Sequence, residues 1–214
     1  MSDTFSSRYK DKNVLVVGAH PDDIELGMGG TVARLARAGA RVTMVIGCVP
    51  DKFETRVTEA KQSAAILGAK ARVLLDEGPA RVEDAKVYEL VRRLDAVVKE
   101  LVPAAIFTHG NRDLHNDHVI MHNVSKSTQR IKAVDFFCYN PTTCRPTPVS
   151  FQPTAFVDIS ETLETKLKAI HAHPSQFNGR GLNTDFLVDV ARALGRMSGV
   201  QYAEGLEVMH LMIS

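Results

Sequence analysis

The chain has 214 residues, 44% of them hydrophobic and 24% charged, and this composition excludes the collagen-like, coiled-coil and disordered classes. Lys and Arg number 26 against 25 Asp and Glu, giving a net charge of +1, and the absence of a basic block disfavours a nucleic-acid partner. This length predicts one domain spanning residues 1–214.

Signals for export or membrane insertion are not visible in the sequence. The longest uncharged runs, such as residues 101–111, are shorter than the ~20 apolar residues of a spanning helix. The beginning of the chain, MSDTFSSRYKDK, does not contain the apolar stretch of a secretory signal. We therefore expect a cytoplasmic protein without a membrane span, whose oligomeric state the sequence does not reveal. Without a CxxC pair, reduced packing residues are expected at Cys48, Cys138 and Cys144.

Val-rich strands alternate with amphipathic helices in the first half of the chain. Short apolar runs predict strands at 12–19, 42–48, 71–75 and 104–108. The spacing of apolar residues predicts helices at 24–38, 56–67 and 87–101. Because parallel neighbouring strands need a crossover element, this alternation predicts an α/β fold with a Rossmann-like, mostly parallel sheet flanked by helices.

The second half of the chain gives a weaker pattern. Helices are expected at 114–126, 161–172 and 184–197, and strands at 134–139, 155–159 and 206–213. Residues 140–153 hold four of the nine prolines, which excludes a central strand and predicts a loop that forms a wall of the site. Residues 178–183 contain two glycines and fit either a flap or an ordinary surface turn.

Polar side chains follow two of the predicted strands, at the edge where sites of such sheets form. The first strand runs into AHPDD, in which Pro21 stiffens the turn that carries His20, Asp22 and Asp23. The fourth strand runs into HGNRDLHNDH, with the polar residues His109, Asp113, His115, Asp117 and His118.

A hydrolytic zinc site has three protein ligands drawn from imidazole nitrogens and carboxylate oxygens, and it keeps a fourth position open. His20, Asp23 and His118 can supply that set. We expect one Zn²⁺ per chain at the metal site, with another divalent transition metal as the alternative.

Acid and base groups for amide hydrolysis are available beside these ligands. Asp22 can remove the proton of the attacking water, and His115 can stabilise the oxyanion and protonate the leaving amine. Either Asp117 or Asp113 can orient His115 and favour its charged form.

Each cluster also has a simpler interpretation. An HxxH pair at a helix start is often a capped turn, and an Asp pair there is often only an N-cap, but these accounts do not explain two clusters at adjacent strand ends. A dinucleotide site is disfavoured because no GxGxxG is present. His109 stays open. Neighbouring, structural or surface roles are expected for His122, His171, His173 and His210.

At AHPDDIELGMGG and HNDH the chain resembles the PIG-L/LmbE-type family of zinc-dependent de-N-acetylases, which act on substrates containing N-acetylglucosamine. Softer similarity extends through RVTEAKQSAAILGA, FQPTAFVDISETLETKLKAIHAHPSQ and YAEGLEV. The chain departs from the family pattern at Asn116, where Pro is common, and this makes the turn less rigid without removing a functional group.

This resemblance implies the same zinc ligands, the same base, and His115 with Asp117 as its partner. It also implies that Arg56 contacts substrate and that Gln176 lies near the pocket, while Asp113 either touches substrate or braces His115.

The expected function is removal of the acetyl group from a small-molecule N-acetylated amino sugar, or its conjugate, by metal-activated water. Hydrolysis of a non-sugar amide by the same site, and non-catalytic carbohydrate binding, are the alternatives.

Overall fold

A mostly parallel sheet forms the centre of the computed structural model, which describes residues 4–141, 151–177 and 184–213. Within these ranges seven strands lie in the order β3-β2-β1-β4-β5-β7-β6. Their bounds are β1 Asn13–Gly18, β2 Arg41–Ile46, β3 Lys70–Val73, β4 Ala105–His109, β5 Asp135–Tyr139, β6 Ala155–Asp158 and β7 Ala203–His210. β1 pairs in parallel with β2 and β4, whereas β7 runs antiparallel to β5 and β6. The predicted α/β fold is confirmed.

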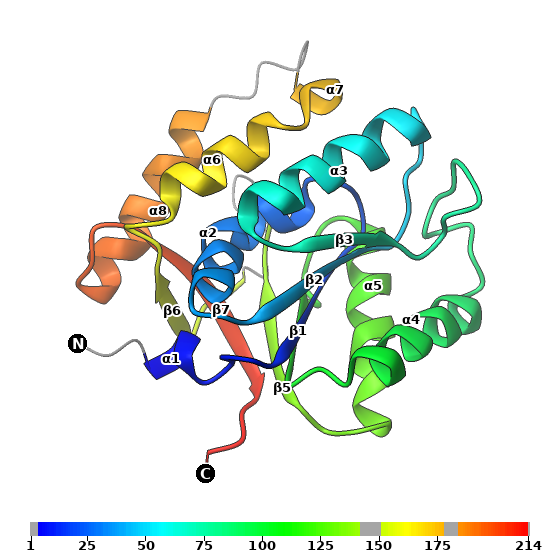
Figure 1. Ribbon diagram of the computed structural model, residues 1–214, viewed down its shortest axis with the longest axis horizontal. Helices are drawn as coiled ribbons and strands as arrows, with labels where there is room; N and C mark the ends of the chain where they lie inside the picture. Colours follow the sequence, from blue (N-terminus) through cyan, green and yellow to red (C-terminus); the bar gives the residue numbers. More distant parts are fainter. Residues whose placement is uncertain (1–3, 142–150, 178–183, 214) are drawn as a thin grey trace.

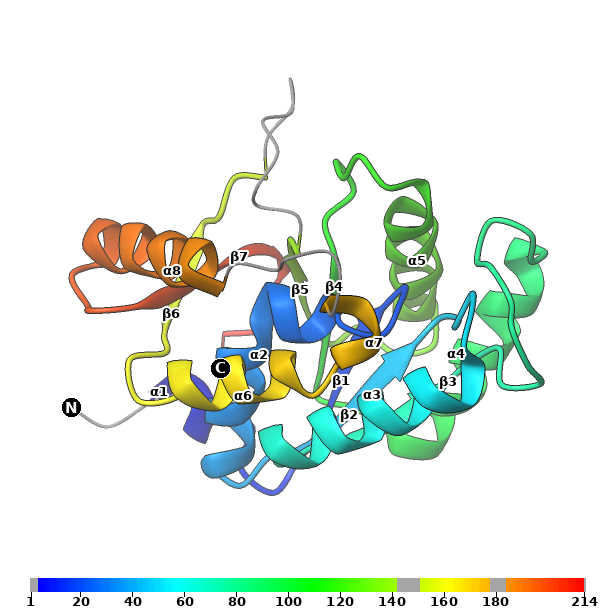
Figure 2. The same ribbon diagram turned by 90° about the horizontal axis from the view of Figure 1, so that it is seen from above.

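Helices cover both faces of this sheet (Figure 1, Figure 2). One face packs against α2, α3, α6 and α8, and the other against α4 and α5. The helix bounds are α1 Thr4–Ser7, α2 Asp23–Arg37, α3 Phe53–Leu67, α4 Val87–Leu101, α5 Asn116–Ser127, α6 Leu163–His171, α7 Pro174–Phe177 and α8 Thr184–Ser198, with a 3₁₀ turn η1 at Thr128–Arg130.

The Val-rich run of β1 explains why the strand lies in the middle of the sheet. Val14 and Val16 belong to the core on one face, and Leu15 and Val17 to the core on the other. Successive side chains of a strand point to opposite faces, so a continuous apolar run is buried only where helices cover both sides. The turn that follows β1 therefore lies at the carboxyl edge of the sheet, between the ends of β2 and β4.

Most predicted elements lie within a few residues of the observed ones, with two differences. The last strand ends at His210 instead of residue 213, and it begins at Ala203 because its first half pairs with β6. The short helices α1 and α7 were not predicted. Residues 142–150, which make up most of the predicted wall, the segment 178–183 and Cys144 lie outside the described residues.

The glycines of α2 allow close packing against the second half of the chain. A Cβ atom on Gly30 would lie 2.7 Å from Cγ2 of Ile159, and one on Gly27 would overlap the ring of Tyr139. A larger residue at either position would force the backbones apart. The GMGG run thus lets α2 contact both β5 and the turn before α6.

A buried ion pair joins α6 and β7 to the same part of α2. Lys166 Nζ lies 2.6 Å from Oε1 of Glu204, and both side chains are almost inaccessible to solvent. Glu204 also accepts hydrogen bonds from the backbone N–H groups of Gly30 and Thr31, and Lys166 donates to the carbonyl of Leu26. This pair therefore connects the helix that begins at the strand-end cluster to the last third of the chain.

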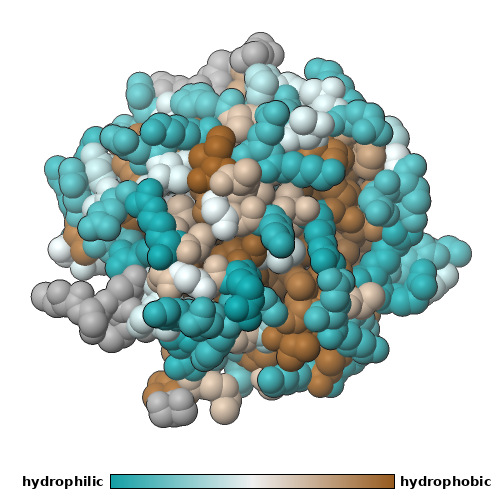
Figure 3. Space-filling model, viewed as in Figure 1, coloured by the Kyte–Doolittle hydropathy of each residue, from teal (hydrophilic) through white to brown (hydrophobic). Residues whose placement is uncertain are grey.

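The surface seen in Figure 3 is a mosaic of hydrophilic and apolar side chains. A groove of about 620 Å³ lies at the β3 edge of the sheet, between α3, β3 and α4, and none of the predicted site residues lines it. Among the described residues, no helix has both the length and the apolar character needed to cross a membrane.

We expect Lys166→Met to lower the free energy of unfolding by about 3–5 kcal/mol, because it leaves the Glu204 carboxylate buried without its cation. Urea denaturation measures this loss. The matched control is Asp189→Ala, which removes an exposed pair with Arg192 and should leave the free energy of unfolding nearly unchanged, because solvent screens that pair. Equal losses in the two variants would contradict the importance of the buried pair.

Candidate metal centre and active site

The two polar clusters meet at the carboxyl edge of the sheet. β1 and β4 are hydrogen-bonded neighbours, and the segments that follow them run into the first turns of α2 and α5. One donor atom each from His20, Asp23 and His118 lies within 4.8 Å of the other two. The convergence predicted from the sequence is therefore present in the structure.

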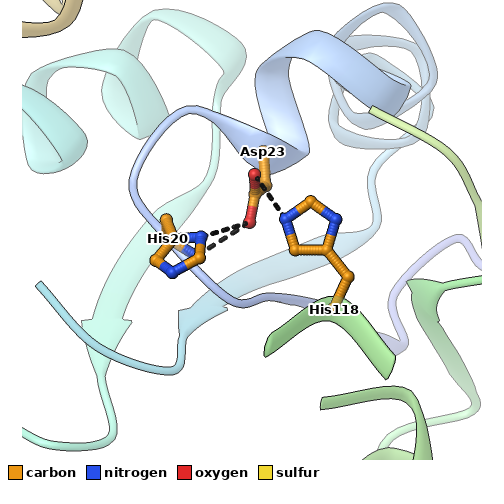
Figure 4. A group of neighbouring side chains, drawn as sticks. All are labelled: His20, Asp23 and His118. Carbon is orange, nitrogen blue, oxygen red and sulfur yellow. Dashed lines mark hydrogen bonds and ion pairs between the residues drawn. The ribbon is translucent and has the colours of Figure 1, made fainter. Parts of the chain in front are cut away.

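The three predicted metal ligands face one another (Figure 4). Nδ1 of His20 lies 3.6 Å from Oδ2 of Asp23, and Nε2 of His118 lies 3.4 Å from Oδ1 of the same carboxylate. Asp23 and His118 are buried, and His20 is half-buried. Two imidazoles and one carboxylate fit a divalent transition metal with a fourth position left for substrate or water.

Each of the two predicted ligand imidazoles also contacts a carboxylate other than that of Asp23. Nδ1 of His118 lies 2.9 Å from Oδ2 of Asp113, and Nε2 of His20 lies 2.9 Å from Oδ2 of Asp117. Metal-binding histidines usually donate their second ring N–H to such a partner, which fixes the ring and leaves the other nitrogen for the metal. Asp113 and Asp117 therefore supply the hydrogen-bond acceptors that orient the two imidazoles of a metal centre.

Asp23 is anchored by the turn that starts α2. Its Oδ2 atom accepts hydrogen bonds from the backbone N–H groups of Ala19 and His20, at 3.0 and 2.8 Å. Burial opposes its ionisation, but the charge and the hydrogen bond of His118, together with the nearby His109 ring, hold the pKa of Asp23 well below its usual value. The carboxylate is thus ionised and fixed in place.

His109 braces the site and keeps its neutral form. Its Nε2 atom accepts a hydrogen bond from the backbone N–H of Ala19, and its ring stacks on His118 with centroids 4.0 Å apart. Burial and the charge of His118 lower the pKa of His109 to about 4. His122, expected to be a neighbour, has its Nδ1 2.9 Å from the carbonyl oxygen of His109 and so fixes that strand end.

Asp22 has the protonation behaviour expected of a general base near neutral pH. Burial, with a contribution from the charge of Asp23, raises the pKa of Asp22 to about 7. Asp22 caps α2 with a left-handed φ of 97° and makes no side-chain capping hydrogen bond. A non-glycine residue in this conformation is strained, and such strain is found where side-chain placement is functionally constrained.

His115 lies beside the ligands but has a different partner from the one expected. Its ring centroid is 4.6 Å from that of His118 and 4.9 Å from that of His20. The carboxylate of Asp117 contacts His20, and it is the backbone N–H of Asp117 that donates to Nδ1 of His115. Burial and the charges of His118 and His20 lower the pKa of His115, so the charged form expected from a carboxylate partner is disfavoured.

The predicted substrate contacts occupy three different environments. Arg56 of α3 is buried, donates to Asp51 through Nη1, and has a buried Nε without a hydrogen-bond partner. Its charge acts on the Asp22 carboxyl.

Asp113 interacts with His118 and accepts from the backbone N–H of His115, so the structure shows it bracing the site. Gln176, in α7, is half-buried.

A buried network behind Asp22 was not predicted. Oε1 of Glu25 accepts from the hydroxyl of Ser63 at 2.5 Å and lies 3.0 Å from Nε2 of His173. Burial lowers the pKa of His173, but its hydrogen bond to Glu25 outweighs burial and raises it overall, and the resulting charge acts on Asp22. The HAHPSQ segment contained His173, but nothing in its spacing indicated the partner in α2.

A protein-family model described as PIG-L, GlcNAc-PI de-N-acetylase, matches residues 15–128, which is more than half of the chain. The chain is 29% identical over 180 residues to the uncharacterized deacetylase YaiS of Escherichia coli K12, covering 79% of this chain and 95% of that protein. It is 28% identical over 232 residues to the diacetylchitobiose deacetylase of Thermococcus kodakarensis, covering 91% and 82%.

A solved structure with a different chemistry shares the fold. The 4-carboxy-2-hydroxymuconate hydratase GalB of Pseudomonas putida KT2440 superimposes with a TM-score of 0.78 at 21% identity, covering 95% of this chain and 98% of that one. At this identity the likeness shows the fold alone. The chemistry of this chain therefore depends on its own residues at the strand ends.

We expect metal binding at neutral pH to release about two protons, one from each ligand imidazole. Burial opposes the charged form of His20, but hydrogen bonding to Asp117 and Cys48 and the charge of Asp23 outweigh it and raise the pKa of His20 to about 10. The charge of Asp23 and the hydrogen bond to Asp113 likewise raise the pKa of His118 to about 9. Both rings are thus protonated without metal, so affinity should rise with pH up to about these values.

Calorimetric Zn²⁺ titration in buffers of different ionisation enthalpy measures the proton count. Asp22→Asn is the matched control, because it removes any proton that the Asp22 carboxyl contributes. Binding without proton release, or tighter binding at lower pH, would contradict the assigned protonation.

Proposed function

The chain belongs to the PIG-L family of de-N-acetylases, and from this membership we propose that it hydrolyses the acetamide of an N-acetylglucosamine-type amino sugar or its conjugate, releasing acetate and a free amine. The observation that carries the proposal is the His20–Asp23–His118 group with Asp22 beside it. The diacetylchitobiose deacetylase to which the chain is similar supports this substrate class.

We propose Zn²⁺ as the metal held by this group, because borderline-soft Zn²⁺ combines readily with imidazole and carboxylate donors. Two carboxylates that orient the ligand rings, at 2.9 Å each, support this assignment. The bound ion would supply a Lewis acid that polarises the amide carbonyl and makes water nucleophilic near neutral pH.

Asp22 acts as general base in this proposal. A pKa of about 7 lets its carboxylate take the proton of the attacking water and lets the resulting acid give that proton to the departing nitrogen. A carboxyl with an ordinary pKa near 4 would hold the proton too weakly for the second step. The same side chain can therefore serve both halves of the reaction.

His115 stabilises the oxyanion as a neutral hydrogen-bond donor. Because Nδ1 accepts from the backbone N–H of Asp117, the ring proton of the neutral form lies on Nε2. That N–H can donate a hydrogen bond to the developing oxyanion, and the ring does not have to become charged for this. This differs from the imidazolium expected from the sequence, and it moves protonation of the amine to Asp22.

Arg56 is the strongest candidate for a substrate contact outside the metal centre. Its guanidinium is buried and its Nε is without a partner, so a hydroxyl or anionic group of the substrate can complete its hydrogen bonding. The sugar-binding side of the site would then include α3.

We expect metal-free protein to release no acetate and added Zn²⁺ to restore release, because amide hydrolysis depends on the metal held by the strand-end group. An acetate assay over N-acetylglucosamine, chitobiose-type and nucleotide-linked sugars, and small non-sugar acetamides measures it. Turnover of acetamides alone would favour a non-sugar amidase, and saturable sugar binding without acetate would favour a binding module. Full activity after chelation would reject the metal mechanism.

We expect Asp22→Asn to lower kcat by about 10²- to 10⁴-fold while zinc stoichiometry is unchanged, because the amide cannot accept the proton of water. In the wild type, kcat should fall as the pH drops below about 7, where Asp22 becomes protonated, and this limb should vanish in the variant. Asp189→Asn, an exposed acid on α8, is the control. Near-native turnover in Asp22→Asn would remove Asp22 from the mechanism.

A further inference from the structure

A second group of metal-capable side chains adjoins the first and contains a thiol. One donor atom each from His20, Cys48 and Asp117 lies within 4.8 Å of the other two. Of the three donors of the first position, the group shares only His20. Its other members, Cys48 and Asp117, are not among the three donors of the first position.

The backbone fixes these three side chains on separate elements. The N–H of Cys48 donates to the carbonyl of Ala19 at 2.9 Å, which extends the β1–β2 pairing beyond the strands and places Cys48 alongside the His20 turn. Asp117 lies in the first turn of α5. Three neighbouring elements therefore converge on one point, as they do at the first metal position.

Burial makes this group unusual. Cys48 is a free cysteine with no solvent exposure, and Asp117 is only 4% exposed. The Oδ1 atom of Asp117 is buried and has no hydrogen-bond partner. A buried carboxylate oxygen without a partner is rare in proteins, and an ion is one of the explanations it requires.

We propose that Cys48, Asp117 and Nε2 of His20 form a second, inhibitory site for a thiophilic divalent cation such as Zn²⁺ or Cd²⁺. Sulfur, nitrogen and carboxylate donors together suit these ions, whereas Mg²⁺, Ca²⁺ and Mn²⁺ prefer oxygen. Binding forms one bond to each donor and releases the thiol proton of Cys48 and the Nε2 proton of His20 to solvent. When both positions are filled, His20 has lost both ring protons and bridges the two cations as an imidazolate.

Inhibition follows from the sharing of His20, and this part rests on the proposed function. The Nε2–Asp117 hydrogen bond orients His20 toward the first metal position. A cation on Nε2 replaces that hydrogen bond and withdraws the Asp117 carboxylate. Excess metal should therefore reduce activity that one equivalent of metal supports.

Titration of the reduced, metal-free protein with Co²⁺ tests the site without turnover. We expect two equivalents to bind, one of them accompanied by a near-ultraviolet thiolate-to-cobalt band, because sulfur is present only in the second donor set. Cys48→Ser should bind one equivalent without the band. Cys138→Ser is the matched control, because Cys138 is also buried and free but its Sγ contacts His122, 3.6 Å away, and it should keep the band.

Inhibition by excess Zn²⁺ or Cd²⁺ provides the second measurement. The inhibitory midpoint should move upward by about 10- to 100-fold or more in Cys48→Ser, since even loss of an orienting partner costs that much metal affinity. Cys48→Ala replaces this variant if serine prevents folding.

A wild type that binds one equivalent without a band, or a band that persists in Cys48→Ser, overturns the site. Equal inhibition of wild type and Cys48→Ser overturns its inhibitory role. The cobalt stoichiometry and the thiolate-to-cobalt band are measured without substrate. They therefore test the second site even if the protein is not a deacetylase.

Discussion

The buried carboxylate of Asp23 is the charge on which the rest of the site depends. Two backbone N–H groups hold it at the start of α2, and imidazoles face both of its oxygens. A buried carboxylate is costly unless positive charge opposes it. Without metal, protons on His20 and His118 supply that charge, and a divalent cation can replace them. The raised pKa of these imidazoles and the capacity to bind a cation therefore have the same cause, which is the need for positive charge beside the buried Asp23 carboxylate.

The fold satisfies this requirement with two helix starts rather than with a loop. α2 begins at Asp23 and α5 at Asn116, and both follow strands that are neighbours in the sheet. Backbone N–H groups at helix starts favour the carboxylates placed there. The Lys166–Glu204 pair ties α2 to the second half of the chain, so that α2 cannot shift independently of β7. Rigid first turns thus set the distances between donors.

Sequence periodicity predicted which residues share the sheet edge, because the carboxyl ends of parallel strands lie together. It could not predict the partner of Asp117, since that depends on ring rotation and on where α5 begins. With α5 starting at Asn116, His115 becomes the N-cap and the Asp117 carboxylate is left to contact His20. The partner of His173 could not be predicted for a related reason: Glu25, in α2, is 148 residues away, and only tertiary packing brings the two side chains together.

The two nitrogens of His20 divide the site into two halves of unequal selectivity. Nδ1 faces Asp23, and that donor set accepts several transition metals. Nε2 faces Asp117, whose hydrogen bond strengthens His20 as a ligand but also places a buried carboxylate beside a thiol. The Asp117 carboxylate that orients His20 for the first metal position is therefore also a donor of the proposed second position. In the proposed two-site arrangement, discrimination between soft and hard metals rests on Cys48, after β2, rather than on the three ligands that the sequence motifs predict.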